Sequence, residues 1–161
     1  MEFVHKSVLF AETVAAMQAT PGKWLVDGTA GGGGHARAIA ESGCHLLAVV
    51  QDPDAIAVLH RRLDDLPNVT IVHDNFANIK NILIDRGLSG IDGMLLDLGV
   101  SSFQLDTAER GFSYMADAPL DMRMDQRQTK TAEDIVNTYS ESELYRIIRD
   151  YGEDKFAKNI A

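Results

Sequence analysis

Short apolar runs alternate with amphipathic stretches along the first hundred residues of the chain. The runs lie at 24–26, 45–50, 69–72 and 91–96. Each is short, is bounded by polar or turn residues and is typical of a buried strand. The stretches between them, at 35–41, 55–63 and 76–86, have the apolar spacing of helices. This alternation predicts βαβ units and a parallel sheet, and right-handed crossovers favour the strand order 3-2-1-4.

A further helix is predicted before the first strand, over residues 5–18. Its apolar positions form a rough helical face, and Thr20-Pro21-Gly22 closes it. We expect this helix to cap the sheet. The chain therefore begins as an α/β domain.

The pattern changes after Gly99. Residues 101–125 are rich in polar and turn residues and predict no strand. Capping boxes are expected at Thr131–Asp134 and Ser140–Glu143, each opening a helix, and residues 152–161 begin a further helical pattern. We divide the chain into an α/β part at 1–100 and a helical part at 101–161. Few strands and a helical pattern that runs to the last residue together predict a truncated domain.

The segment between the first strand and the first helix is rich in glycine. Asp27 ends the strand, and Gly28 and Gly31–Gly34 follow it. Glycine permits positive φ and a close approach of the backbone to a ligand, so the loop is typical of nucleotide-binding α/β sheets. A flexible surface turn is the alternative. The loop lacks the Lys-Ser/Thr ending of a P-loop, which disfavours ATP hydrolysis.

Several candidate site residues follow strand ends. Ligands of such sheets bind beyond the carboxyl ends of the strands, at the topological switch point between strands 1 and 4. We expect Asp27, the glycine loop and Asp97 to converge there. Asp97 is either a site carboxylate or a cap for the segment after it. His35 is either a ligand contact or an exposed residue of the first helical turn. Phe76 either stacks on a flat ring or packs in the core.

Length, composition and charge indicate which classes of protein the chain can belong to. The chain has 161 residues, enough for one domain with a core, and its single cysteine excludes an intrachain disulfide framework. No apolar window reaches the roughly 20 residues of a membrane span, and no signal peptide is evident, so we expect a cytoplasmic protein without membrane contact. No Cys/His spacing predicts a metal site. A net charge of −9 argues against general affinity for nucleic acid.

From His5 to Ala161 the chain resembles the N-terminal half of the bacterial 16S rRNA (cytosine-N4)-methyltransferases, which use S-adenosylmethionine. The most specific blocks of the resemblance are 26–29, 33–35, 95–102, 104–106, 109–113, 119–125, 136–138 and 151–153. The run Pro-Leu-Asp-Met-Arg-Met-Asp at 119–125 is hard to obtain by chance.

The resemblance implies a Rossmann-like methyltransferase domain that a helical substrate-recognition insertion interrupts after strand 4. It further implies a family chain about twice as long, and methyl transfer to the exocyclic N4 of a cytidine in 16S rRNA of the small ribosomal subunit. Carried over by position, the cofactor-binding residues are Gly33, Gly34, His35, Phe76, Asp97 and Gln104. The first three would contact the methionine end and Phe76 the adenine. Asp97 would be the catalytic residue, accepting an N–H of the target amine.

The chain also departs from the family pattern. Val50 stands where the family has an aspartate that binds the ribose hydroxyls, and Asp52 lies two residues further on. A second hypothesis is therefore a catalytically inactive module associated with RNA or the ribosome. A nicotinamide dehydrogenase would require the same acid and leaves the block at 119–125 unexplained. We also expect self-association through the edge of the incomplete sheet.

Overall fold

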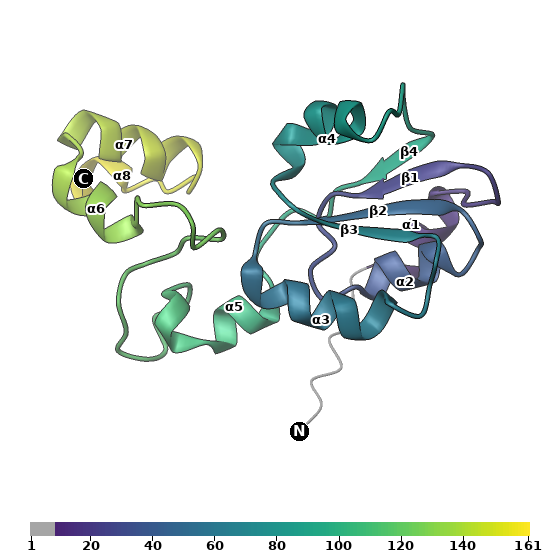
Figure 1. Ribbon diagram of the computed structural model, residues 1–161. Helices are drawn as coiled ribbons and strands as arrows, with labels where there is room; N and C mark the ends of the chain where they lie inside the picture. The colour runs from purple at the N-terminus through teal and green to yellow at the C-terminus, as the bar shows by residue number, and fades with distance from the viewer. Residues whose placement is uncertain (1–8) are drawn as a thin grey trace. The chain divides into compact units, whose positions relative to one another are not determined.

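The computed structural model describes residues 9–161 (Figure 1). The chain folds as two units, one ending at Ser101 and the other beginning at Ser102. The helix predicted over 5–18 is α1, Phe10–Ala16. The part of that prediction before residue 9 lies outside the described residues.

The first unit contains a parallel sheet. Its strands are β1 Trp24–Asp27, β2 His45–Val50, β3 Val69–His73 and β4 Gly93–Leu95. The order is β3-β2-β1-β4, and all three pairings are parallel. The predicted order 3-2-1-4 is confirmed. β4 is shorter than the apolar run 91–96 that predicted it.

Helices cover both faces of this sheet (Figure 1). On one face lie α1, α2 Gly34–Ala40 and α3 Pro53–Leu63; on the other lies α4 Ile79–Asp85. Successive residues of β2 alternate between the two layers: Leu46 and Ala48 join the core with α2 and α3, while Leu47 and Val49 join the core with α4. A strand buried on both faces explains the continuous apolar run of β2.

Local capping explains two helix boundaries that differ from the prediction. Asp52 accepts a hydrogen bond from the Asp54 N–H, and Pro53 occupies the first turn, so α3 begins two residues before Ala55. The helix predicted over 76–86 is divided. Asn75 caps a short 3₁₀ turn, η1 Phe76–Asn78, before α4 begins.

The second unit is helical. Its elements are α5 Ser102–Asp106, η2 Ala108–Arg110, α6 Ala132–Thr138, α7 Glu141–Asp150 and α8 Ala157–Ile160. The capping boxes at Thr131 and Ser140 are both confirmed. α5 and η2 were not predicted. The helix expected from Gly152 begins only at Ala157, because residues 151–156 turn after α7.

Hydrogen bonds hold the two ends of the loop 111–122 together. Gly111 has φ +70°, and a Cβ there would lie 2.4 Å from the Pro119 carbonyl oxygen, so only glycine fits. The Met122 N–H donates to the Arg110 carbonyl at 3.0 Å. Arg110 Nη2 donates to the Arg123 carbonyl at 3.0 Å. The loop therefore projects from a fixed base.

None of the helices within residues 9–161 has the length and apolar composition that crossing a membrane requires.

Candidate functional site

The carboxyl ends of β1 and β4 lie side by side in the sheet. Asp27 is in register with Leu95, and the Gly28 N–H donates to the Leu95 carbonyl at 2.9 Å. A Cβ on Gly28 would lie 2.7 Å from side-chain atoms of Met94 and Leu96. The chain leaving β1 thus passes directly over the end of β4, which brings the glycine loop and Asp97 to one place.

Neighbouring elements hold the glycine loop. The Ala30 N–H donates to the Val49 carbonyl at 3.1 Å, and the Gly33 N–H donates to the Ala30 carbonyl at 2.7 Å. From α3, Arg62 Nη1 donates to the Gly32 carbonyl at 2.7 Å. The loop is anchored to β2 and α3, so the alternative of a flexible surface turn does not describe it.

His35 lies at the start of α2 and is buried, with 7% of its surface exposed. Its ring stacks on Phe10 with the centroids 5.3 Å apart, and its Nδ1 lies 3.9 Å from Asp97 Oδ2. Nε2 is buried and has no hydrogen-bond partner among the described residues. The interpretation of His35 as an exposed first-turn residue is therefore wrong. A buried ring nitrogen without a partner is suited to receive a polar ligand atom.

Asp97 follows β4 and its side chain is 57% exposed. Its backbone N–H donates to Thr29 Oγ1 at 2.7 Å. The helix after it begins only at Ser102, so Asp97 is not the cap of that helix. The carboxylate stands at the sheet end, open to a ligand on one side and facing His35 on the other.

Asp27, the last residue of β1, is a buried carboxyl linked to Asp97 through Thr29. Only 2% of its surface is exposed, and its Oδ1 accepts the Thr29 N–H at 3.1 Å. The pKa of Asp27 is raised to about 7, mainly by burial and to a smaller extent by the negative charge of Asp97, while hydrogen bonds from Thr29 act in the opposite direction. Near neutral pH the Asp27 carboxyl is therefore divided between its protonated and ionised forms.

The remaining predicted cofactor residues fall in different parts of the chain. Phe76 opens η1, and its Cβ lies 3.1 Å from the position of a Cβ on Gly28, beside the end of β1. Gln104 lies on α5 in the second unit and is buried. The first unit thus brings together Asp27, the glycine loop, His35, Phe76 and Asp97, while Gln104 belongs to the other unit.

The end of β2 carries no free carboxylate. Val50 is buried, and the Asp52 carboxylate accepts the Asp54 N–H as the cap of α3. Beside them Asn75 Nδ2 donates to Gln51 Oε1 at 2.7 Å. Sequence reasoning missed this amide pair and Thr29. For Thr29 a signal existed, a hydroxyl residue two positions after the acid that ends the first strand.

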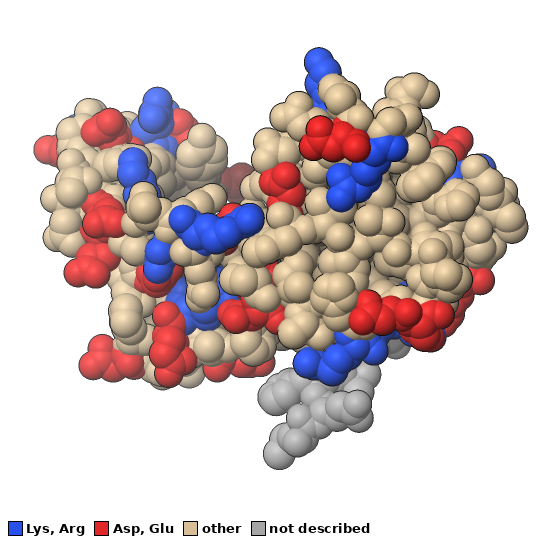
Figure 2. Space-filling model, viewed as in Figure 1, with Lys and Arg blue, Asp and Glu red and all other residues tan. Residues whose placement is uncertain are grey.

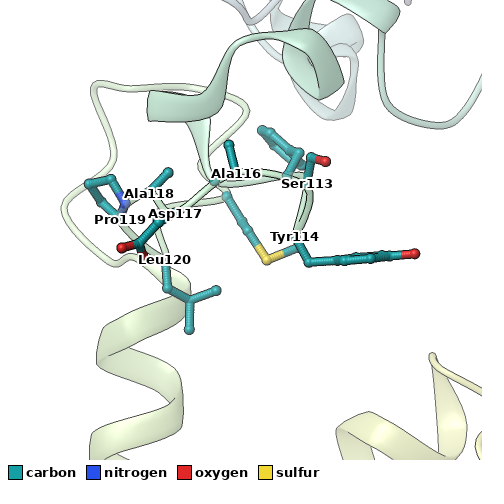
Figure 3. A pocket seen from close by; sticks show the side chains of 10 residues that line it. Ser113, Tyr114, Ala116, Asp117, Ala118, Pro119 and Leu120 are labelled. Atoms are coloured by element: carbon teal, nitrogen blue, oxygen red, sulfur yellow. The ribbon is translucent and has the colours of Figure 1, made fainter.

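A concavity of about 320 Å³ lies in the loop 111–122 of the second unit. Ser113 and Tyr114 lie across it from Asp117, Pro119 and Leu120 (Figure 3). Tyr114 is 95% exposed, so its ring is open to a flat partner. The loop combines a rigid neck with an exposed aromatic side chain.

Charges on the molecule are mixed in sign. On the face shown in Figure 2, Lys and Arg side chains are interspersed with Asp and Glu over both units. The described residues contain no group of three or more His, Cys, Asp or Glu side chains arranged to hold a metal ion.

The sequence model of the MraW methylase family matches residues 2–161. The chain belongs to this family. It is 56% identical over 165 residues to "Ribosomal RNA small subunit methyltransferase H" of Lachnospira eligens, covering all of this chain and 52% of that protein. The protein of the same name from Deinococcus deserti is 50% identical, over 98% of this chain and 52% of that protein. The chain spans about half the length of these relatives.

A crystal structure entitled putative rRNA-methylase from Clostridium thermocellum also aligns. The TM-score is 0.45 at 18% identity, over 62% of this chain and 58% of that chain.

Proposed function

We propose that this member of the MraW methylase family serves methyl transfer from S-adenosylmethionine to the exocyclic N4 of a cytidine in 16S rRNA of the small ribosomal subunit. The observation that carries the proposal is the convergence of the anchored glycine loop, His35 and Asp97 at the carboxyl ends of β1 and β4. This is the place where α/β sheets bind nucleotide-like ligands. The names of the relatives support the substrate class.

The residues of the first unit suit the methionine end of the cofactor. His35 Nε2 is buried without a partner, and the loop at Gly33 and Gly34 presents main chain without side chains in front of it. Phe76 lies beside Gly28 at the end of β1 and would meet the adenine. When bound, S-adenosylmethionine supplies an electrophilic methyl group. The Val50 side chain cannot accept a hydrogen bond from ribose, so we expect weaker binding than in a protein with an acid there.

Asp97 would act on the target amine. The lone pair of the cytosine N4 is delocalised into the ring, which makes the amine a poor nucleophile. A carboxylate that accepts one N–H favours a pyramidal nitrogen with its lone pair free to attack. Asp97 is more than half exposed and its main chain is fixed by Thr29, so it can meet an incoming base in a defined position.

The second unit would contact the RNA. The support is the loop 111–122, whose base is closed by main-chain bonds and whose Tyr114 ring is exposed. Stacking on an aromatic side chain is a common way to hold an unpaired base. In an RNA-binding assay we expect Tyr114→Leu to weaken binding severalfold, whereas Tyr151→Leu, which changes an equally exposed tyrosine in the same unit, leaves it unchanged. Equal affinities for both variants would remove the loop from the RNA site.

Methyl transfer is tested with the chain itself. Small ribosomal subunits that lack the modification are incubated with the chain and methyl-labelled S-adenosylmethionine, and the labelled nucleoside is identified after digestion. We expect N4-methylcytidine from the unchanged chain and almost none from Asp97→Ala. Asp64→Ala, which removes an exposed carboxylate at the end of α3, serves as the control.

The alternative function is a non-catalytic module that binds RNA or the ribosome, and Val50 is the observation that favours it. Subunit binding without label transfer would support this alternative. Full transfer by Asp97→Ala would reject the role of Asp97.

A further inference from the structure

A short hydrogen-bond chain links the ends of β1 and β4 beneath the proposed site. The Thr29 N–H donates to Asp27 Oδ1 at 3.1 Å, and the Asp97 N–H donates to Thr29 Oγ1 at 2.7 Å. All three residues belong to the first unit, and they join positions 68 residues apart in the sequence.

Thr29 is the link that fixes Asp97. At the two strand ends the Gly28 N–H donates to the Leu95 carbonyl. Asp97 lies two residues beyond Leu95, where the sheet no longer holds the chain. The Thr29 hydroxyl oxygen therefore extends the pairing of β1 with β4 to the residue that carries the site carboxylate.

Asp27 fixes Thr29 in turn. The Asp27 carboxyl is fully enclosed at the end of β1, so its position is set by the sheet rather than by solvent. Its Oδ1 accepts the Thr29 N–H, which holds the turn in the conformation that presents the hydroxyl to Asp97. A buried carboxyl that accepts a main-chain N–H in this way is a rigid anchor.

We infer that Thr29 and Asp27 are positioning residues for Asp97: Thr29 holds the Asp97 main chain at the end of β4, and Asp27 holds Thr29. The inference rests on the proposed function for the claim that Asp97 meets the target base. The geometry of the network itself does not depend on that claim.

The network also contains a carboxyl, that of Asp27, whose charge changes near neutral pH. Among the described residues, the Asp97 carboxylate faces two titratable side chains, Asp27 and His35. Since the pKa of Asp27 is raised to about 7, a second negative charge forms beneath Asp97 as the pH rises through neutrality. Asp27→Asn removes that charge without removing the oxygen acceptor for the Thr29 N–H.

Three variants separate these roles. Thr29→Val has nearly the same shape but no acceptor, Thr29→Ser keeps the hydroxyl, and Asp27→Asn keeps an oxygen acceptor but cannot ionise. Thr70→Val, an exposed threonine on β3, is the matched control. Circular dichroism and the thermal midpoint show whether each variant folds.

The first readout is hydrogen exchange of the Asp97 amide, followed by NMR in the chain without any ligand. We expect exchange to be on the order of tenfold faster in Thr29→Val, and little changed in Thr29→Ser and Thr70→Val. The Asp97 resonances should report a titration near pH 7 that disappears in Asp27→Asn. Unchanged exchange in a folded Thr29→Val chain would overturn the inference.

The second readout is the methyl-transfer assay described above. We expect Thr29→Val to lower kcat by about ten- to a hundredfold with little change in KM for S-adenosylmethionine, because misplacing a reacting group costs rate rather than ground-state binding. Thr29→Ser should restore most of the rate. A kcat unchanged by Thr29→Val would reject the positioning role. Absence of transfer by the unchanged chain would reject the proposed function. The hydrogen-exchange result would still show whether Thr29 holds the Asp97 main chain.

Discussion

The two units of this chain are stabilised in different ways. In the first unit the buried side chains are mainly apolar and lie on both faces of the sheet. In the second, the described buried residues are Gln104, Arg110, Asp125 and Ala157, and its contacts include helix caps, main-chain turns and Arg–Asp pairs. One unit is built by burial of apolar surface and the other by local polar contacts.

This difference matters for function. A sheet with a packed core on each face fixes the positions of its strand ends, so Thr29 can be held within hydrogen-bond distance of both Asp27 and Asp97. Helices and loops held by caps and ion pairs are marginal alone and respond to pH and salt. We therefore expect the first unit to supply the fixed geometry of the site and the second to supply adaptable contacts.

The largest predicted effect is a cavity in the first unit. Leu47 is fully buried in the middle of β2, and Leu47→Ala should lower the free energy of unfolding by about 3–5 kcal/mol. Val136→Ala, which truncates a half-exposed side chain on α6, should cost far less. Chemical denaturation measures both. Similar costs at the two positions would contradict the contrast between the units.

The next effect is the pH dependence caused by Asp27. Its folded-state pKa of about 7 exceeds the ordinary value of 3.8, so its contribution to stability is complete below pH 3.8 and is lost as the pH rises through 7. Between pH 5 and 7 the free energy of unfolding should fall by about 2 kcal/mol. Asp27→Asn should remove this fall. An identical pH profile for the variant would show that Asp27 ionises normally.

A smaller effect, of opposite sign in pH, is expected at α6. Thr131→Ala removes a cap and should destabilise this helix by about 1 kcal/mol, seen as faster amide exchange in α6 alone. Hydrogen bonds from Thr131 lower the pKa of Asp134, so the stabilisation from this pair is present above the usual pKa and is lost as the pH falls through the lowered one. Thr131→Ser should preserve protection. Equal exchange in the Ala and Ser variants would contradict the capping role.

The smallest effect is weak self-association of the first unit. β4 forms an edge of the described sheet, and Leu96, Leu98 and Val100 after it are exposed. We expect sedimentation to show a concentration-dependent increase in mass that Leu98→Lys removes. Ile84→Lys, an equally exposed position on α4, should leave it in place. A constant monomer mass over the accessible concentrations would contradict this expectation.

The sequence predicted the parts of the fold that depend on local pattern. Apolar runs located the strands, the crossover rule predicted the order 3-2-1-4, and the motifs at Thr131 and Ser140 located two capping boxes. It did not predict that the helix expected over 76–86 is divided into a 3₁₀ turn and α4, because this division depends on the Asn75 cap. It also did not predict α5, whose five residues have no clear periodicity.

The site was predictable only in outline. The positions of the glycine loop and Asp97 follow from strand ends, which the pattern reveals. The burial of His35 depends on Phe10 stacking over its ring, and the role of Thr29 depends on a bond to a residue 68 positions away. Such contacts arise from the packing of distant segments, and no local spacing encodes them.

The central claim is that the first unit forms a cofactor site, and calorimetric titration of S-adenosylmethionine tests it most directly. The unchanged chain and Val50→Asp would be titrated side by side. We predict saturable binding by the unchanged chain, and binding about tenfold tighter by Val50→Asp, since a carboxylate at the end of β2 gives the ribose hydroxyls an acceptor. Absence of binding by both folded proteins would contradict the claim.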